Sequence, residues 1–88
     1  MADLSFTEDA FSEYLAWQSE DRKTLKRINQ LLKAIQREPF GGEGKPEPLK
    51  GDFSGLWSRR INEKDRLVYS VSGDVITVYQ CKGHYGDK

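Results

Sequence analysis

A stretch rich in glycine and proline divides this chain into two parts with different patterns. Residues 41–48 read GGEGKPEP, so that Glu47 stands between Pro46 and Pro48. Proline fixes its own φ, removes a backbone donor and pushes the preceding residue out of the helical region. Glu47 is therefore expected in an extended backbone. Glycine and proline at this density predict a shaped surface loop, and such loops often carry function on a rigid scaffold.

Residues before this loop follow a helical pattern. Thr7 suits a helix N-cap, and Glu8 and Asp9 place negative charge in the first turn, where the helix dipole favours it. A break at residues 19–21 separates a second helix, and Glu38-Pro39 ends it. The elements expected here are a strand at residues 3–6 and helices ending near residues 18 and 37.

Apolar side chains recur at helical spacing and predict the face that each helix buries. The side chains expected in the core are Phe11, Tyr14, Leu15 and Trp17 of the first helix and Leu25, Ile28, Leu31, Leu32 and Ile35 of the second. A mainly basic stripe lines a different face of the second helix, formed by Lys23, Lys26, Gln30, Lys33 and Arg37. It is either a solvated face or one that contacts RNA, and the solvated interpretation is favoured.

Residues after the loop change to a strand pattern rich in Trp, Val, Ile and Tyr. The expected strands cover residues 56–61, 67–71 and 75–81, and Ser72-Gly73-Asp74 predicts a tight hairpin turn. A further strand near residues 48–50 is restricted to a sheet edge by Pro48. The predicted fold is α+β, with two N-terminal helices packed on one face of a twisted antiparallel β-sheet.

Length and composition exclude several classes of protein. The 88 residues predict one domain, 1–88, with a small core. No apolar run approaches the roughly 20 residues that span a membrane, and the N-terminus lacks the features of a signal peptide. Cys81 is the only cysteine, so no intrachain disulfide can form, which suits a reducing cytosol. Because Cys81 and His84 are the only cysteine and histidine, a Cys/His-rich zinc site within one chain is excluded. No other metal and no cofactor are expected.

Charge is unevenly distributed although the net charge is zero. Residues 1–21 contain six acidic residues and neither lysine nor arginine. Residues 22–88 contain all fourteen lysines and arginines against eight acidic residues, a net charge of +6. A basic majority of this kind can bind a polyanion on one face, whereas ordinary solvated faces are the plainer explanation.

One glutamate, one histidine and one or two arginines together have the chemistry needed to cleave RNA. Glu47 can accept a proton, His84 can donate one near neutral pH, and Arg66, with either Arg59 or Arg60, can hold a phosphate. RNA supplies its own nucleophile in the 2′-hydroxyl. Arg59 and Arg60 point to opposite faces of a strand, so at most one of them faces the site. The plainer alternatives are a surface carboxylate at Glu47 and an incidental histidine in a frayed tail.

Two other possible sites, a cysteine–histidine pair and a phosphate-binding loop, have less support in the sequence than the Glu/His/Arg set. Cys81 with His84 suggests a thiol nucleophile, but the cysteine lies in an apolar strand without an oxyanion-hole signature, so a buried structural cysteine is favoured. The GGEG run is not a phosphate-binding P-loop, because G-x-x-x-x-G-K-[ST] is absent.

The stretch PFGGEGKPEPLKGDFSGLWSRRINEKDRLVYSV, the distal CKGHY and the upstream YLAWQSEDRKTLKRINQLLKAI resemble the YoeB-type toxins of the RelE superfamily. The likeness covers nearly all of residues 4–85. It implies a RelE-like, microbial-ribonuclease-like fold and a bacterial toxin–antitoxin module. The toxin of such a module enters the ribosomal A site and cuts mRNA there by metal-independent general acid–base chemistry. It thereby inhibits translation, and the products are a 2′,3′-cyclic phosphate and a 5′-hydroxyl.

The resemblance also implies a role for each site residue. Glu47 corresponds to the general base, His84 to the general acid, and Arg66 to the residue that stabilises charge on the scissile phosphate. The residues that would hold the RNA are Lys50, Arg60 and Tyr85. The implied partners are the ribosome, mRNA and a partly disordered YefM-like antitoxin, with a homodimer suggested and no membrane association.

Two other functions remain open at the level of sequence. The chain could bind RNA or the ribosome and inhibit translation without cutting, or belong to the gyrase-poisoning branch of the same superfamily. A paired base and acid argues against both, since neither function needs one. Lys82-Gly83 departs from the family pattern and predicts a looser approach to His84. The tail Gly86-Asp87-Lys88 extends beyond the family's usual His-Tyr end.

Overall fold

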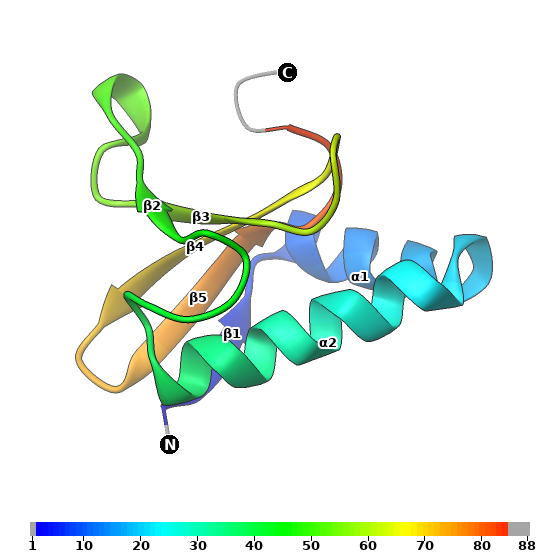
Figure 1. Ribbon diagram of the computed structural model, residues 1–88, viewed down its shortest axis with the longest axis horizontal. Coiled ribbons are helices and arrows are strands. Elements are labelled where there is room, and N and C mark those ends of the chain that lie inside the picture. Colours follow the sequence, from blue (N-terminus) through cyan, green and yellow to red (C-terminus); the bar gives the residue numbers. More distant parts are fainter. Residues whose placement is uncertain (1, 85–88) are drawn as a thin grey trace.

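Two helices and a five-stranded sheet form an α+β fold, as predicted. The computed structural model describes residues 2–84. The elements in chain order are β1 (Asp3–Phe6), α1 (Glu8–Glu20), α2 (Arg22–Arg37), β2 (Glu47–Pro48), the 3₁₀ turn η1 (Gly51–Phe53), β3 (Trp57–Arg60), β4 (Arg66–Ser72) and β5 (Val75–Gln80). Both helices lie on the same side of the sheet, toward the lower right of it in Figure 1.

The sheet is mixed, which corrects the expectation of a purely antiparallel one. Its strand order is β1-β5-β4-β3-β2, and every pair is antiparallel except β1 with β5. The β1 strand can run parallel to β5 because residues 7–74, including both helices, connect the two strands, and a parallel pair needs such a long connection. The Ser72–Asp74 hairpin turn is confirmed, since Ser72 pairs with Val75 across a two-residue turn. The predicted edge strand is confirmed as β2, which is two residues long and begins at Glu47.

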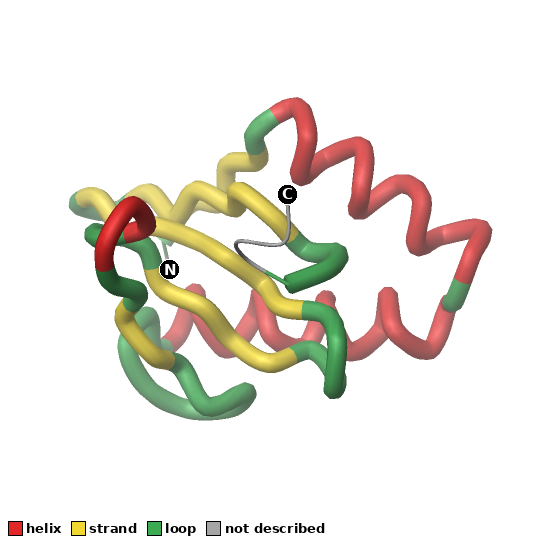
Figure 2. The backbone as a smooth tube through the Cα atoms, turned by 90° about the horizontal axis from the view of Figure 1, so that it is seen from above, coloured by secondary structure: helices red, strands yellow, loops and turns green. Residues whose placement is uncertain are grey.

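Side-chain caps set the helix boundaries. Thr7 Oγ1 accepts a hydrogen bond from the Ala10 N–H at 3.1 Å, which confirms the predicted N-cap. Asp21 alone separates the helices: its N–H donates to Trp17 O at 3.0 Å, and its Oδ1 accepts from the N–H groups of Lys23 and Thr24. One residue therefore ends α1 and begins α2. Figure 2 shows this joint as a short break between the two red helices.

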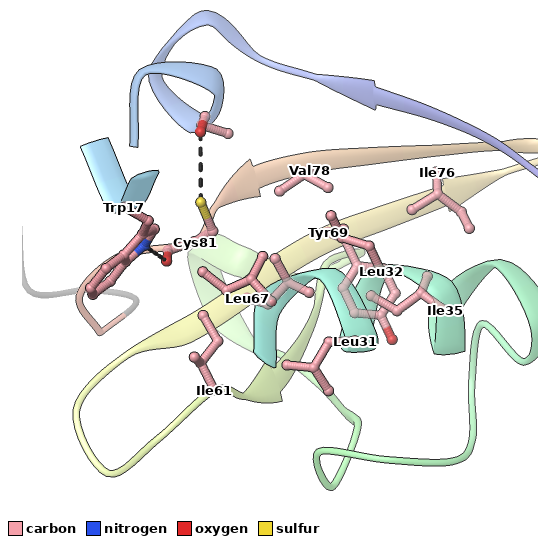
Figure 3. Close-up of a cluster of buried hydrophobic side chains, with 12 residues drawn as sticks. Trp17, Leu31, Leu32, Ile35, Ile61, Leu67, Tyr69, Ile76, Val78 and Cys81 are labelled. Carbon is pink, nitrogen blue, oxygen red and sulfur yellow. Dashed lines mark hydrogen bonds between the residues drawn. The ribbon is translucent and has the colours of Figure 1, made fainter. Parts of the chain in front are cut away.

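The core lies between the sheet and the helices (Figure 3). The helix α2 buries Ile28, Leu31, Leu32 and Ile35, as predicted, and Leu25 is half-buried. From α1 the predicted Trp17 is buried and Tyr14 is half-buried.

Two predictions for the core are wrong, because Phe11 and Leu15 are 51% and 46% exposed. The helix α1 turns Ala10 and Trp17 toward the sheet, which leaves Phe11 and Leu15, four residues apart, on its outer side. Among residues 2–84, no helix has the length and apolar character required to cross a membrane.

Candidate functional site

A small hollow of about 160 Å³ lies on the face of the sheet that the helices leave open. Strand residues alternate between faces, so Arg66 points away from the core that its neighbour Leu67 enters. Four of the lining residues were predicted as site residues, and two were not. The lining residues are Lys45, Glu47, Ser58, Arg60, Arg66 and His84.

Glu47 reaches the hollow through the short edge strand β2. It pairs with Ser58 of β3, and Pro48 pairs with Trp57, while the Leu49 N–H donates to Leu56 O at 2.9 Å. Paired residues of an antiparallel sheet share a face, so the Glu47 and Ser58 side chains lie on the same side. The two prolines thus hold Glu47 extended at a sheet edge, with its side chain exposed to solvent.

Arg60 and Arg66 stand directly opposite each other on β3 and β4. Like charges at such a position repel each other, which favours the binding of an anion between them. The Arg66 guanidinium is oriented by its own turn, because Nη1 donates to the carbonyl oxygens of Asn62, Glu63 and Asp65 at 2.7, 3.2 and 3.1 Å. The pairing of Arg60 with Arg66 confirms that Arg66 lies close to this arginine across the sheet, as the sequence predicted.

Arg59, next to Arg60, faces the other way and is fully buried, as strand alternation predicts. Its guanidinium donates to Tyr69 Oη at 3.0 Å and to the carbonyl oxygens of Glu43 and Glu38 at 2.8 and 2.6 Å. Tyr69 Oη in turn donates to Pro39 O at 2.7 Å. Arg59 therefore shapes the loop that leads to Glu47.

Lys45 is a lining residue that sequence analysis missed. Its φ of 52° is left-handed, which is uncommon for a residue other than glycine. Gly44 beside it lies so close to α2 and β3 that an added Cβ would come within 2.9 Å of Leu31 Cδ2. Gly44 O also accepts from the Arg60 N–H at 2.7 Å. The glycine-rich loop signalled a shaped segment, but the direction of Lys45 depends on these tertiary contacts.

His84 lines the hollow because the segment before it is bound to the rest of the protein. The Cys81 N–H donates to Glu13 Oε1 at 2.8 Å, and the Trp17 indole N–H donates to Cys81 O at 2.8 Å (Figure 3). Lys82 Nζ lies 2.7 Å from Glu20 Oε1. The acidic N-terminal section thus anchors the C-terminal segment to α1.

The same segment is also bound to the β3–β4 turn. The Gly83 N–H donates to Asp65 Oδ1 at 2.7 Å, and the Arg66 N–H donates to Gly83 O at 2.8 Å. Lys82 and Gly83 each make specific contacts, and the looser approach to His84 expected from them stays a prediction. Neither contact could be read from the sequence, because the partners lie 18 or more residues away.

Among the described residues, one predicted site residue does not line the hollow. Lys50 is exposed just after β2, at the start of η1, and is absent from the wall. Tyr85 lies outside the described residues. The RNA contacts expected of both stay predictions.

Cys81 is a buried structural cysteine, as the sequence favoured. Burial first, and then the nearby Glu13 carboxylate, raises the pKa of its thiol to about 12. Its Sγ lies 3.6 Å from Ala10 O (Figure 3). A thiol with so high a pKa is a poor nucleophile at neutral pH.

The hollow joins one carboxylate, one imidazole, two guanidinium groups and one ammonium group. Such a set can accept a proton, donate a proton and stabilise negative charge on a phosphate. Within residues 2–84, no group of three or more His, Cys, Asp or Glu residues is placed to hold a metal ion.

Comparison with known proteins assigns the chain to a family. The model of the YoeB-like toxins of bacterial type II toxin–antitoxin systems matches residues 6–85. The chain belongs to the YoeB toxin family. The toxin YoeB of Synechocystis is 52% identical over 82 residues, which cover 93% of this chain and 95% of that protein. The chain is thus a toxin of a toxin–antitoxin system, as its motifs suggested.

Solved structures of the YoeB family share the fold. The YoeB dimer from Staphylococcus aureus matches with a TM-score of 0.88 and 45% identity, over 96% of this chain and 98% of that one. The toxin in the heterotetrameric YoeB–YefM complex from the same organism matches with a TM-score of 0.88 and 44% identity, over 97% and 99%. The YoeB fold thus accommodates both a dimer and an antitoxin complex in that organism.

Proposed function

We propose that this toxin is a ribosome-dependent endoribonuclease that cleaves mRNA in the ribosomal A site. The observation that carries the proposal is the hollow, where Glu47 and His84 lie with the opposed pair Arg60 and Arg66. The carboxylate, the imidazole and the arginine pair come from three separate parts of the chain. An anion-binding surface alone would not require the carboxylate.

In the proposed reaction, Glu47 removes the proton of the 2′-hydroxyl, and the oxygen forms a bond to the adjacent phosphorus. The bond from phosphorus to the 5′-oxygen breaks, and His84 gives that oxygen a proton. Arg66 and Arg60 stabilise the charge that builds on the phosphate. The products are a 2′,3′-cyclic phosphate and a 5′-hydroxyl, and each proton transfer accounts for about 10²–10⁴ in rate.

The same proposal extends to partners and location. The comparison complex contains a YefM antitoxin, so we expect a YefM-like antitoxin to bind this chain, with a partly disordered segment covering the basic surface of the hollow. A homodimer is expected by analogy with the staphylococcal YoeB dimer. Because the substrate is mRNA on the ribosome, the site of action is the cytoplasm.

Primer extension on a defined mRNA, with and without translating ribosomes, tests the proposal. Wild type should cut at codon positions only with ribosomes, whereas Glu47→Ala and His84→Ala should be folded and lose about 10² or more in rate. Asp9→Ala, which removes an exposed carboxylate on α1, is the matched control and should cut normally. Inhibited translation with intact mRNA would refute cleavage and favour a non-catalytic binder. Cleavage of naked RNA would remove the ribosome from the mechanism.

A further inference from the structure

Asp65 is a buried carboxylate for which the proposed reaction has no use. It lies at the end of the β3–β4 turn, and only 2% of its surface is exposed. Its Oδ2 accepts a hydrogen bond from the Asn62 side-chain amide at 3.0 Å, and its Oδ1 accepts the Gly83 N–H at 2.7 Å. Burying a carboxylate costs free energy unless such bonds compensate, so these contacts explain how the site tolerates it.

The turn itself does not need the Asp65 carboxylate to close. Asn62 Oδ1 accepts from the N–H groups of Lys64 and Asp65 at 3.0 and 2.8 Å, and the Ile61 N–H donates to Asp65 O at 3.1 Å. These bonds, made by the Asn62 side chain and by backbone groups, complete the turn without the Asp65 carboxylate. The carboxylate oxygen Oδ1 instead binds a residue 18 positions later in the chain.

Gly83 is held at both of its peptide groups by consecutive residues. Its N–H donates to Asp65, and its carbonyl accepts from the Arg66 N–H at 2.8 Å. Its φ of 82° is in the left-handed region, where glycine is free to turn the chain. Cys81 and Lys82 are bound to α1, but the backbone can still rotate at the glycine that follows them. The hydrogen bond from Gly83 to Asp65 therefore sets the direction in which the chain continues to His84.

We propose that Asp65 is a positioning residue that holds His84 in register with Arg66. The inference rests on the proposed function, in which His84 is the general acid. The Asp65 side chain binds the Gly83 N–H, and the Arg66 backbone N–H binds the Gly83 carbonyl oxygen, so both residues hold Gly83 in place. The distance between the acid and the residue that holds the phosphate is therefore set by the two consecutive residues Asp65 and Arg66, where the turn meets β4.

The test uses an RNA in which sulfur replaces the bridging 5′-oxygen at the cleaved bond. A thiolate leaves without being protonated, so cleavage of this RNA does not need the general acid. Single-turnover rates are measured on programmed ribosomes for wild type, Asp65→Ala, Asp65→Asn, His84→Ala and Glu47→Ala. On ordinary RNA, Asp65→Ala should lose roughly 10–10² in rate, the cost of a misplaced group. Asp65→Asn keeps an acceptor for the Gly83 N–H, without its charge, and should lose less.

On the sulfur RNA, the cleavage rates of Asp65→Ala and His84→Ala should both recover to within about 3-fold of the wild-type rate. That remaining difference is small compared with the roughly 10²–10⁴-fold that a general acid contributes on ordinary RNA. Glu47→Ala should stay slow, because the base is still needed. Glu63→Ala is the matched control: it removes an exposed carboxylate from the same turn but leaves Asp65 and its Gly83 contact in place, and it should retain nearly the full rate on ordinary RNA.

Several outcomes would overturn the inference. Equal losses for Asp65→Ala on both RNAs would show a general structural defect, and a wild-type rate on ordinary RNA would show that the Asp65 contact has no effect. If Asp65→Ala does not fold, as judged by circular dichroism, the comparison rests on Asp65→Asn, which must lose rate on ordinary RNA and recover on sulfur RNA. Failure of wild type to cut ordinary RNA would instead refute the proposed function, so the two failures are distinguishable.

Discussion

At the scale of the residue, adjacent arginines of β3 serve different parts of the molecule. Arg59 is buried and donates three hydrogen bonds that shape the loop before Glu47, whereas Arg60 is exposed at the hollow opposite Arg66. The buried Arg59 guanidinium is tolerated because it donates hydrogen bonds to three oxygen atoms. The Arg60 guanidinium at the surface is repelled by that of Arg66, and a bound anion would relieve this repulsion.

Arg59→Ala should therefore lower the stability of the folded protein, whereas Arg60→Ala should lower only the cleavage activity. Losing the Arg59 guanidinium leaves buried acceptors without partners and should lower the free energy of unfolding by at least about 3 kcal/mol. Arg60→Ala should change it by less than about 0.5 kcal/mol. Urea denaturation and the cleavage assay measure the two effects, and equal stability losses would contradict this division.

The Cys81 thiol should be almost unreactive in the folded protein. Its pKa of about 12, against 9.0 for an ordinary thiol, reduces the thiolate fraction roughly a thousand-fold at about pH 8. Because the charged form is disfavoured by folding, the thiol contributes stability below its unfolded pKa, and this contribution is lost as the pH rises from about 9 toward 12. Alkylation followed by mass spectrometry, with and without urea, checks the prediction. Fast labelling without urea would contradict it.

At the scale of the element, Asp21 is the single residue that ends α1 and begins α2. Its carboxylate accepts the Thr24 hydroxyl at 2.8 Å as well as backbone N–H groups at the start of α2. These bonds, the Thr24 hydroxyl first, lower the pKa of Asp21 from its usual 3.8. The depressed pKa stabilises the folded state above about pH 4, and the stabilisation is lost as the pH falls through that range.

Asp21→Ala should lower the melting temperature at neutral pH, and its difference from wild type should shrink below about pH 4. Thr7→Ala is the matched control, since Thr7 caps α1 without a titratable group. It should cost about 1 kcal/mol at either pH. Thermal melts at the two pH values compare the variants, and a pH-independent loss for Asp21→Ala would show that the carboxylate charge is irrelevant.

At the scale of the whole molecule, the helices and the hollow lie on opposite faces of the sheet. Part of the acidic N-terminal section makes contacts within the protein, since Glu13 and the exposed Glu20 bind residues 81 and 82. The cations of the hollow, Lys45, Arg60 and Arg66, belong to the part of the chain that carries a charge of +6. The basic stripe of α2 faces solvent on the other side.

Salt dependence distinguishes these two basic surfaces. Affinity of the His84→Ala toxin for programmed ribosomes should fall with salt, and Lys45→Ala in that background should reduce the log–log slope by about 0.7. Lys33→Ala, which removes an exposed lysine of the α2 stripe, should leave the slope unchanged. Should Lys33→Ala reduce the slope and Lys45→Ala not, RNA would lie along α2 instead.

The sequence by itself determined the fold class, the Thr7 cap, the α2 core stripe, the hairpin turn and the extended backbone at Glu47. Each depends on local rules: side-chain periodicity, capping and the restricted φ of proline. The opposite faces of Arg59 and Arg60 also follow from strand alternation alone. The family resemblance, which rests on the same loop and strand motifs, is confirmed by the match over residues 6–85.

Only the tertiary structure decided how distant segments meet. The exposure of Phe11 and Leu15 depends on the rotation of α1 against the sheet, and the parallel pairing of β1 depends on where the last strand lies. Lys45 enters the hollow through the close contacts of Gly44, and His84 through the hydrogen bonds of Gly83. These outcomes depend on packing and hydrogen bonds between residues far apart in the chain, which a local pattern does not encode.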